Sequence, residues 1–183
     1  MRLYVVRHGQ SESNMQGKWG GHYNTPLTSK GLEQAKQLSD KLTDINFEII
    51  ISSSLIRARQ TAEIIQERVN VPLILSDEFM ERNMGVYEGL TQEEIMGKYP
   101  DLWNRHCTRS LDDAPTNGET YRKFHTRINK ALIKLKEDYS DKNVLLVTHG
   151  FVARVINWCC SDISFDEMHG YNLENCEIAK FTI

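Results

Sequence analysis

Histidine and arginine side chains follow three short apolar runs that lie far apart in the chain. Arg7 and His8 come after residues 3–6, Arg57 comes after residues 47–51 and a serine turn, and His149 comes after residues 144–147. A neutral imidazole suits attack on a phosphomonoester dianion, because it carries no negative charge for the dianion to repel. Guanidinium and backbone N–H groups can then stabilise the charge on the phosphoryl oxygens. Together these residue types point to phosphoryl transfer.

The charge balance argues against two classes of large anionic partner. The chain has 183 residues, and its 22 Lys and Arg against 25 Asp and Glu give a net charge of −3 at pH 7. No summed positive field is available to hold a nucleic-acid backbone or an anionic membrane surface. The mean hydropathy of −0.48 leaves no room for a membrane-spanning segment. We therefore expect a small phosphorylated molecule as the partner, bound by a local cluster of cations.

The four cysteines lack the spacing of a zinc site or a disulfide framework. Cys107 and Cys176 are isolated, and Cys159 and Cys160 are neighbours. The first residues turn polar at Arg7, too early for a secretory signal. These features predict a cytoplasmic protein without a metal site. The length is typical of one domain, which we expect to span residues 1–183 as a monomer or a homodimer.

Hydrophobic patterns predict the elements that position these side chains. The three apolar runs are typical of buried parallel strands, and further strands are predicted at residues 71–75 and 178–183. Amphipathic patterns predict helices over residues 32–42, 55–69 and 121–135. Thr91 and Glu94 have the spacing of a capping box, so a short helix begins there and stops at Pro100. Residues 104–119 are predicted to form a long surface loop.

Strands that alternate with helices predict an α/β fold. We expect a three-layer sandwich, with a mostly parallel central sheet and helices on both faces. Ligands of such sheets bind outside the carboxyl ends of the strands, where helix N-termini also converge. Arg7, His8, Arg57 and His149 all follow strands and should meet at that edge. The sequence therefore predicts a pocket there for a phosphate-sized dianion.

Six blocks of sequence, in order, resemble the histidine phosphatase superfamily in its phosphoglycerate mutase-like branch. They are residues 5–14, which include Arg-His-Gly, and residues 24–31, 53–62, 81–89, 118–120 and 148–150. An isolated Arg-His-Gly occurs by chance in many proteins, whereas six blocks in order are a specific signal. The resemblance implies the phosphoglycerate mutase-like fold and an activity that needs no metal and no cofactor.

The resemblance also implies a role for each matching residue. His8 would be the nucleophile that becomes phosphorylated, and Glu81 would be the proton donor. Arg7, Asn14, Arg57 and His149 would line the phosphate pocket, with His149 protonated or oriented as a donor. The candidates for substrate binding are Gln10, Ser11, Gly20, Gly21 and Gly150. Arg59 fits the motif less well and should point about 200° away from Arg57 on its helix.

Most of these residues also have a purely structural interpretation. A lone histidine after a strand is more often a hydrogen-bonding structural residue than a nucleophile. Arg57 could be a solvated helix residue, and Glu81 could be a surface charge. The histidines that match no chemical motif are expected at surface or structural positions: His22, His106, His125 and His169. The aromatic residues expected to serve packing are Trp19, Tyr23 and Trp103.

We expect a phosphomonoesterase that hydrolyses a small metabolite through a phosphohistidine intermediate. Two alternatives stay open: a cofactor-dependent phosphoglycerate mutase and a non-catalytic phosphate-binding module. Mutases of the family usually have a longer middle region with extra basic residues, and Asn where this chain has Phe151. Substrate selection is expected to come from residues 15–23, 82–84 and 104–117 and from Phe151. The candidate substrates are alpha-ribazole phosphate, a sugar phosphate or a broad range of phosphomonoesters.

Overall fold

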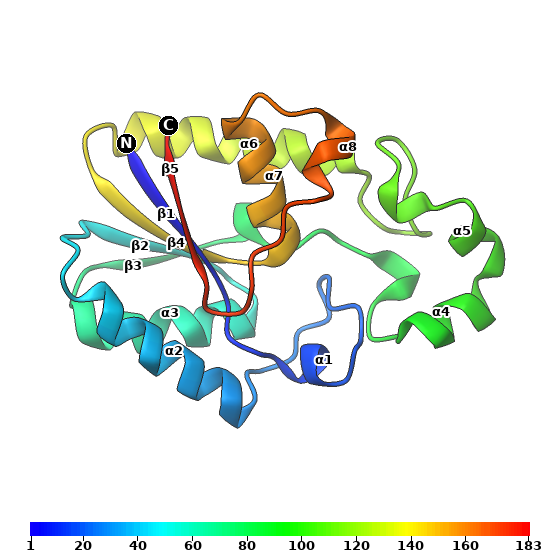
Figure 1. Ribbon diagram of the computed structural model, residues 1–183, viewed down its shortest axis with the longest axis horizontal. Coiled ribbons are helices and arrows are strands. Elements are labelled where there is room, and N and C mark those ends of the chain that lie inside the picture. Colours follow the sequence, from blue (N-terminus) through cyan, green and yellow to red (C-terminus); the bar gives the residue numbers. More distant parts are fainter.

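A five-stranded sheet forms the centre of the molecule in the computed structural model, which describes residues 1–183 (Figure 1). Its strands are β1 (Arg2–Arg7), β2 (Ile49–Ser53), β3 (Leu73–Ser76), β4 (Asn143–Thr148) and β5 (Ile178–Thr182), in the spatial order β3-β2-β4-β1-β5. β1 to β4 run parallel, and β5 pairs antiparallel with β1 at one edge. The predicted mostly parallel sheet is confirmed, and Pro72 lies just before the edge strand β3.

Helices cover both faces of the sheet. On one face α2 (Ser29–Leu42) and α3 (Ile56–Val69) pack against alternate strand residues such as Val6, Ile50 and Leu145. On the other face α6 (Tyr121–Asp138) and α7 (Gly150–Cys160) pack against the intervening ones, such as Val5, Ile51 and Leu146. Side chains alternate between faces along a strand, so β1, β2 and β4 each contribute to both cores. Figure 1 shows these two helical layers on opposite sides of the strands.

Side-chain caps begin several of these helices. Thr28 and Thr120 accept hydrogen bonds from the backbone N–H groups of Gly31 and Lys123 at the starts of α2 and α6. The capping box of Thr91 and Glu94 is present and begins α4 (Gln92–Lys98). Pro100 follows the end of α4 as predicted, and it is also the first residue of α5 (Pro100–Asn104). Proline suits that first position because the N–H it lacks would have no partner inside the helix.

A helical excursion extends beyond the carboxyl edge of the sheet (Figure 1). It contains η2 (Gly85–Tyr87), α4, α5 and η3 (Cys107–Arg109). Its small core consists of Met84, Tyr87, Ile95 and Cys107, all of which are buried. The predicted surface loop over residues 104–119 therefore needs correction, because part of it is a 3-10 helix that buries Cys107 in this core.

Three short elements complete the chain. They are α1 (Glu12–Met15) after β1, η1 (Asp77–Phe79) after β3 and α8 (Phe165–Met168) after α7. The N- and C-termini lie side by side, since the Met1 ammonium group donates a hydrogen bond to the Ile183 carbonyl oxygen at 2.9 Å. No helix combines the length and apolar character needed to cross a membrane.

The turn after β1 is packed tightly against the start of α2. A Cβ atom on Gly9 would lie 2.5 Å from the Gly31 carbonyl oxygen, and a Cβ atom on Gly31 would overlap the Gln10 carbonyl oxygen. Only glycines allow the two backbones to approach this closely. This contact fixes the position of the chain that follows His8.

Replacing Gly31 by alanine tests that contact. We expect Gly31→Ala to lower the free energy of unfolding by about 1–3 kcal/mol, because the added methyl group must displace backbone. Gly97→Ala is the matched control, since nothing lies within 4 Å of its Cβ position in α4. That control should gain up to about 1 kcal/mol from the better helix propensity of alanine. Urea unfolding measures both values, and equal stabilities for the two variants would contradict the analysis.

Candidate active site

A cavity of about 280 Å³ lies where the carboxyl ends of β1, β2 and β4 meet. It is lined by the following of the predicted residues: Arg7, His8, Ser11, Asn14, Gly20, Gly21, Arg57, Glu81 and Gly150. They come from the ends of strands, the starts of α1, α3 and α7, the connection between α1 and α2, and the segment between η1 and η2. The fold thus brings together residues that are up to 143 positions apart in sequence, from residue 7 to residue 150.

His8 presents one ring nitrogen to this cavity. Its Nδ1 lies 2.7 Å from the Gly9 carbonyl oxygen, which can only accept a hydrogen bond, so Nδ1 carries the proton. Nε2 then has a free lone pair, and it accepts a hydrogen bond from Arg57 Nε at 3.2 Å. Only 3 % of His8 is exposed, yet the ring belongs to the cavity wall. Burial, together with the positive charge of Arg57, lowers the pKa of His8 well below its ordinary value.

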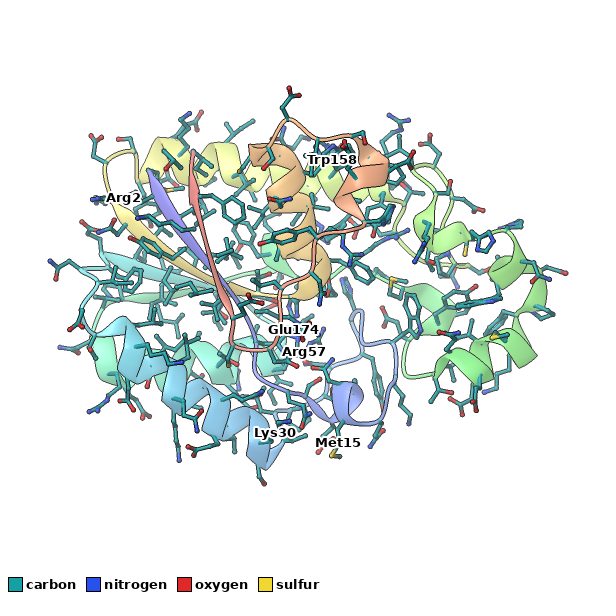
Figure 2. The ribbon with its side chains drawn as sticks, in the orientation of Figure 1. Arg2, Met15, Lys30, Arg57, Trp158 and Glu174 are labelled. Atoms are coloured by element: carbon teal, nitrogen blue, oxygen red, sulfur yellow. The ribbon has the colours of Figure 1, made fainter.

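Two arginines bring positive charge to the cavity without carboxylate partners. Arg57, in the first turn of α3, donates to the carbonyl oxygens of Tyr23 at 3.1 Å and Gly21 at 2.7 Å. Arg7 donates to the Leu173 carbonyl oxygen at 2.9 Å, and its Nε atom is buried without a partner. Burial lowers the pKa of Arg57 to about 10, so it remains a cation at neutral pH. Figure 2 labels Arg57 near the centre of the view, below Glu174, and Lys30 nearer the lower edge of the molecule.

His149 lies behind His8 and outside the cavity wall. The two ring centroids are 5.1 Å apart, and His149 is fully buried. Its Nε2 is 2.8 Å from Ser53 Oγ, and its Nδ1 has no hydrogen-bond partner. Burial and the nearby Arg57 hold the pKa of His149 well below its ordinary value. Burial therefore favours a neutral His149 ring over a protonated one.

Glu81 reaches the cavity from the segment between η1 and η2. Its Oε1 accepts from the Arg82 backbone N–H at 3.0 Å, and its Oε2 accepts from the Phe151 backbone N–H at 3.3 Å. The residue is 8 % exposed, and burial raises the pKa of its carboxyl above the ordinary value. A carboxyl held this way keeps its proton to higher pH than an exposed one, so it can serve as an acid.

The residues after His8 divide between the cavity and the protein interior. Ser11 caps α1 by accepting from the Asn14 backbone N–H at 3.3 Å, while Asn14 Oδ1 accepts from the Ser11 backbone N–H at 3.1 Å. This reciprocal box holds both side chains at the cavity wall. Gln10 is absent from the wall, because its Oε1 accepts from the Thr28 hydroxyl at 3.0 Å.

The cavity wall also contains residues that the sequence analysis did not single out. Arg154 and Asn172 were missed, although Arg154 follows Gly150 by four positions and therefore lies on the same side of α7. Trp19, expected as a packing residue, lines the cavity and also packs against Phe151. No residue of 104–117 lines the cavity, so the expectation that this segment selects the substrate needs correction. Arg59 points away as expected and pairs with Glu63 on the surface.

The ionisation and tautomer of His8 can be measured by nitrogen NMR. We expect protonated Nδ1 and unprotonated Nε2 at pH 6.5, where an unperturbed imidazole is about half protonated, because burial disfavours the charged ring. Arg57→Gln should raise the pKa of His8, but not restore its ordinary value, since burial is the larger cause. A cationic His8 at this pH, or a proton on Nε2, would contradict the geometry.

Comparison with known proteins agrees with this arrangement. Residues 3–183 match the family model of the histidine phosphatase superfamily, branch 1. An adenosylcobalamin/alpha-ribazole phosphatase from Escherichia coli (strain K12) is 32 % identical over 149 residues, which cover 81 % of this chain and 73 % of that protein. A probable phosphoglycerate mutase GpmB from Shigella boydii serotype 18 is 30 % identical over 186 residues, which cover 98 % of this chain and 84 % of the relative.

The fold comparison gives the same result. The crystal structure of the alpha-ribazole phosphatase from Shigella flexneri superposes with a TM-score of 0.91 at 28 % identity, covering 98 % of this chain and 89 % of that one. The shared sheet and the family match cover nearly the entire chain. The chain therefore belongs to the histidine phosphatase superfamily, branch 1, and is a phosphoric monoester hydrolase of that family.

Proposed function

We propose that the protein hydrolyses small phosphomonoesters through a phosphohistidine formed on Nε2 of His8. The observation that carries this proposal is the unprotonated Nε2 of His8, hydrogen-bonded only to Arg57, on a cavity wall that also contains Arg7. A dianion that enters would find two guanidinium groups without carboxylate partners, which favours binding of its charge. Gly20 and Gly150 lie beside these two guanidinium groups and carry no side chain that would fill the space.

The first step transfers the phosphoryl group to the protein. As the substrate binds, the N–H of Arg57 Nε turns from His8 Nε2 to a phosphoryl oxygen, which frees the lone pair. The bond from Nε2 to phosphorus forms while the bond from phosphorus to the ester oxygen breaks. Glu81 gives its proton to that oxygen, and the Gly9 carbonyl oxygen retains the hydrogen bond to Nδ1–H as the ring becomes positively charged. Proton donation of this kind typically contributes about 10²–10⁴ in rate.

The second step returns the protein to its starting state. A water molecule attacks phosphorus and gives a proton to the carboxylate of Glu81, while the bond to Nε2 breaks. Inorganic phosphate leaves, His8 is again neutral and Glu81 is again protonated. Arg7, Arg57 and Asn14 would hold the phosphoryl oxygens, and a neutral His149 would support His8 from behind. Ser11 and Gly21 are candidate substrate contacts on the cavity wall, whereas Gln10 would act on the turn only through Thr28.

Phosphoenzyme trapping tests His8 as the nucleophile. Brief incubation with a ³²P-labelled phosphomonoester, followed by alkaline denaturation, should leave label that is stable to alkali and labile to acid on the wild-type protein. His8→Ala should show no label and at least about 10³-fold slower phosphate release, because no other group replaces the nucleophile. Equal label or equal release in the variant would refute the assignment.

A second histidine serves as the control for this experiment. His106 is exposed, lies outside the cavity wall and adopts a positive φ of 51°, which asparagine tolerates. His106→Asn should therefore label and release phosphate as the wild type does. Labelling of neither wild type nor control, with no phosphate release, would favour a non-catalytic phosphate-binding module.

The outer cavity supports a second candidate function, a phosphoglycerate mutase. Lys18 and Arg154 line it together with the aromatic side chains of Trp19 and Phe151. The Arg154 guanidinium lies 5.1 Å from the Phe151 ring centroid, and its Nε donates to the Tyr171 carbonyl oxygen at 3.0 Å. These cations could bind a carboxylate of the substrate, a role for which mutases usually use a longer middle region. The GpmB relative keeps this alternative open.

An assay with 3-phosphoglycerate distinguishes the two functions. With 2,3-bisphosphoglycerate present, we expect free phosphate as the main product, whereas rapid formation of the 2-isomer with little phosphate would show a mutase. Arg154→Leu should raise KM for 3-phosphoglycerate about tenfold, the effect of losing one charge-assisted hydrogen bond. The same variant should leave KM for p-nitrophenyl phosphate, whose leaving group carries no carboxylate, within about twofold. An equal change for both substrates would contradict binding of a second anionic group by Arg154.

The other expectations about the cellular setting stay predictions. A cytoplasmic location follows from the sequence alone, and so do a monomeric or homodimeric state and the absence of nucleic-acid and membrane partners. A broad range of small phosphomonoesters, a sugar phosphate and alpha-ribazole phosphate remain the candidate substrates. Trp19 and Phe151 would provide an apolar surface for a flat leaving group, such as the alpha-ribazole that alpha-ribazole phosphate would release.

A further inference from the structure

The backbone that carries Glu81 lies in no helix or strand. It follows the end of η1 at Phe79 and precedes η2, which begins at Gly85. Its carbonyl groups accept hydrogen bonds from side chains of other elements instead. Thr148 Oγ1 donates to the Phe79 carbonyl oxygen at 2.8 Å, and His22 Nε2 lies 2.9 Å from that of Glu81. The position of the Glu81 carboxyl therefore depends on what holds this segment.

Arg127 of α6 makes most of these contacts. Its Nη1 donates to the carbonyl oxygens of Glu78 at 2.7 Å and Met80 at 3.0 Å, and its Nη2 donates to that of Glu81 at 3.4 Å. Its remaining donors form a two-pronged ion pair with Glu119, at 2.9 Å from Nη2 and 3.2 Å from Nε. All five N–H groups of the guanidinium thus have acceptors.

The ion pair fixes Arg127 itself. The side chains of Arg127 and Glu119 are only 21 % and 17 % exposed, so solvent screens their attraction less than that of an open surface pair. Glu119 is held in turn by the segment after Glu81, because its backbone N–H donates to the Asn83 carbonyl oxygen at 2.8 Å. The planar guanidinium of Arg127 thus binds Glu119 with some of its N–H groups and backbone carbonyl oxygens with the others. This geometry is well suited to hold the chain segment at a set distance from α6.

Arg127 is absent from the wall of the catalytic cavity, so it does not contact the substrate there. We propose that Arg127, anchored by Glu119, is a positioning residue that holds the Glu78–Glu81 backbone so that the Glu81 carboxyl meets the leaving-group oxygen. This inference rests on the proposed role of Glu81 as the proton donor. A misplacement of about 1 Å at a reacting group can cost about 10²-fold in rate, so the contact matters even from outside the cavity.

The leaving group provides a readout that a merely structural role would not change. An alkyl phosphate releases a strongly basic alkoxide and needs the proton, whereas p-nitrophenyl phosphate releases a weakly basic phenolate that needs little help. The ratio of kcat/KM for these two substrates reports the steps up to departure of the leaving group, and so isolates proton donation. Damage to the phosphate pocket or partial unfolding would lower both values and leave the ratio unchanged.

We expect Arg127→Gln to lower kcat/KM for glycerol 2-phosphate at least about tenfold and that for p-nitrophenyl phosphate less than about threefold. Arg127→Lys keeps a cation beside Glu119 but has fewer donors for the three carbonyl groups, and it should shift the ratio in the same direction by a smaller factor. This variant also tests the inference if Arg127→Gln fails to fold. Equal losses for both substrates, or no loss, in the folded variants would overturn the inference.

Two further variants make the result specific. Arg122→Gln, on the same helix, removes an exposed ion pair with Asp112 and should leave the ratio unchanged; a shift there as large as that of Arg127→Gln would overturn the inference. Glu81→Gln should shift the ratio as Arg127→Gln does, and by a larger factor. If Glu81→Gln lowers both substrates equally, the proposed role of Glu81 fails. If Glu81→Gln shifts the ratio and the folded Arg127 variants do not, only the positioning role fails.

Discussion

Two guanidinium groups without carboxylate partners, that of the buried Arg57 and that of the half-buried Arg7, are the feature on which the rest of the site depends. Arg7 and Arg57 give their hydrogen bonds to carbonyl oxygens and, from Arg57, to the neutral ring of His8, and these partners orient the groups but do not neutralise their charge. A buried cation in this state is costly, and an anion of matching size recovers that cost by binding. The close contact between Gly9 and Gly31 fixes the turn that follows Arg7 and His8.

Burial also prepares the two reacting groups in opposite senses. It lowers the pKa of His8 and raises the pKa of Glu81, because in each case it disfavours the charged form. The histidine is thereby a neutral base and nucleophile, and the carboxyl is a neutral acid. The same desolvation makes stability depend on pH, since an unfolded chain takes up protons at His8 and His149 as the pH falls through about 6.5 and the folded chain does not. The free energy of unfolding that these neutral, buried rings contribute therefore decreases as the pH falls.

The sheet and most of the site could be predicted because both follow from local patterns. Each apolar run that ends in a polar turn forms a parallel strand, so Arg7, His8, Arg57 and His149 reach one edge by topology alone. The segment 104–119 could not be predicted in the same way, because nothing in its local pattern shows that Cys107 packs against Tyr87 and Ile95. Gln10 has the right sequence position for the cavity, but Thr28, eighteen positions away, draws its side chain elsewhere.

The sequence by itself determined the alternation of strands and main helices along the chain, the family and the set of residue types needed for phosphoryl transfer, since these depend on short-range periodicity and on matching blocks. Only the tertiary structure decided which of them face the cavity, that His149 stands behind His8, and that Arg154 and Trp19 join the wall. It also decided that Arg127 holds the backbone of Glu81 from 46 positions away. Burial, orientation and pKa arise from contacts between distant segments, and no local pattern encodes them.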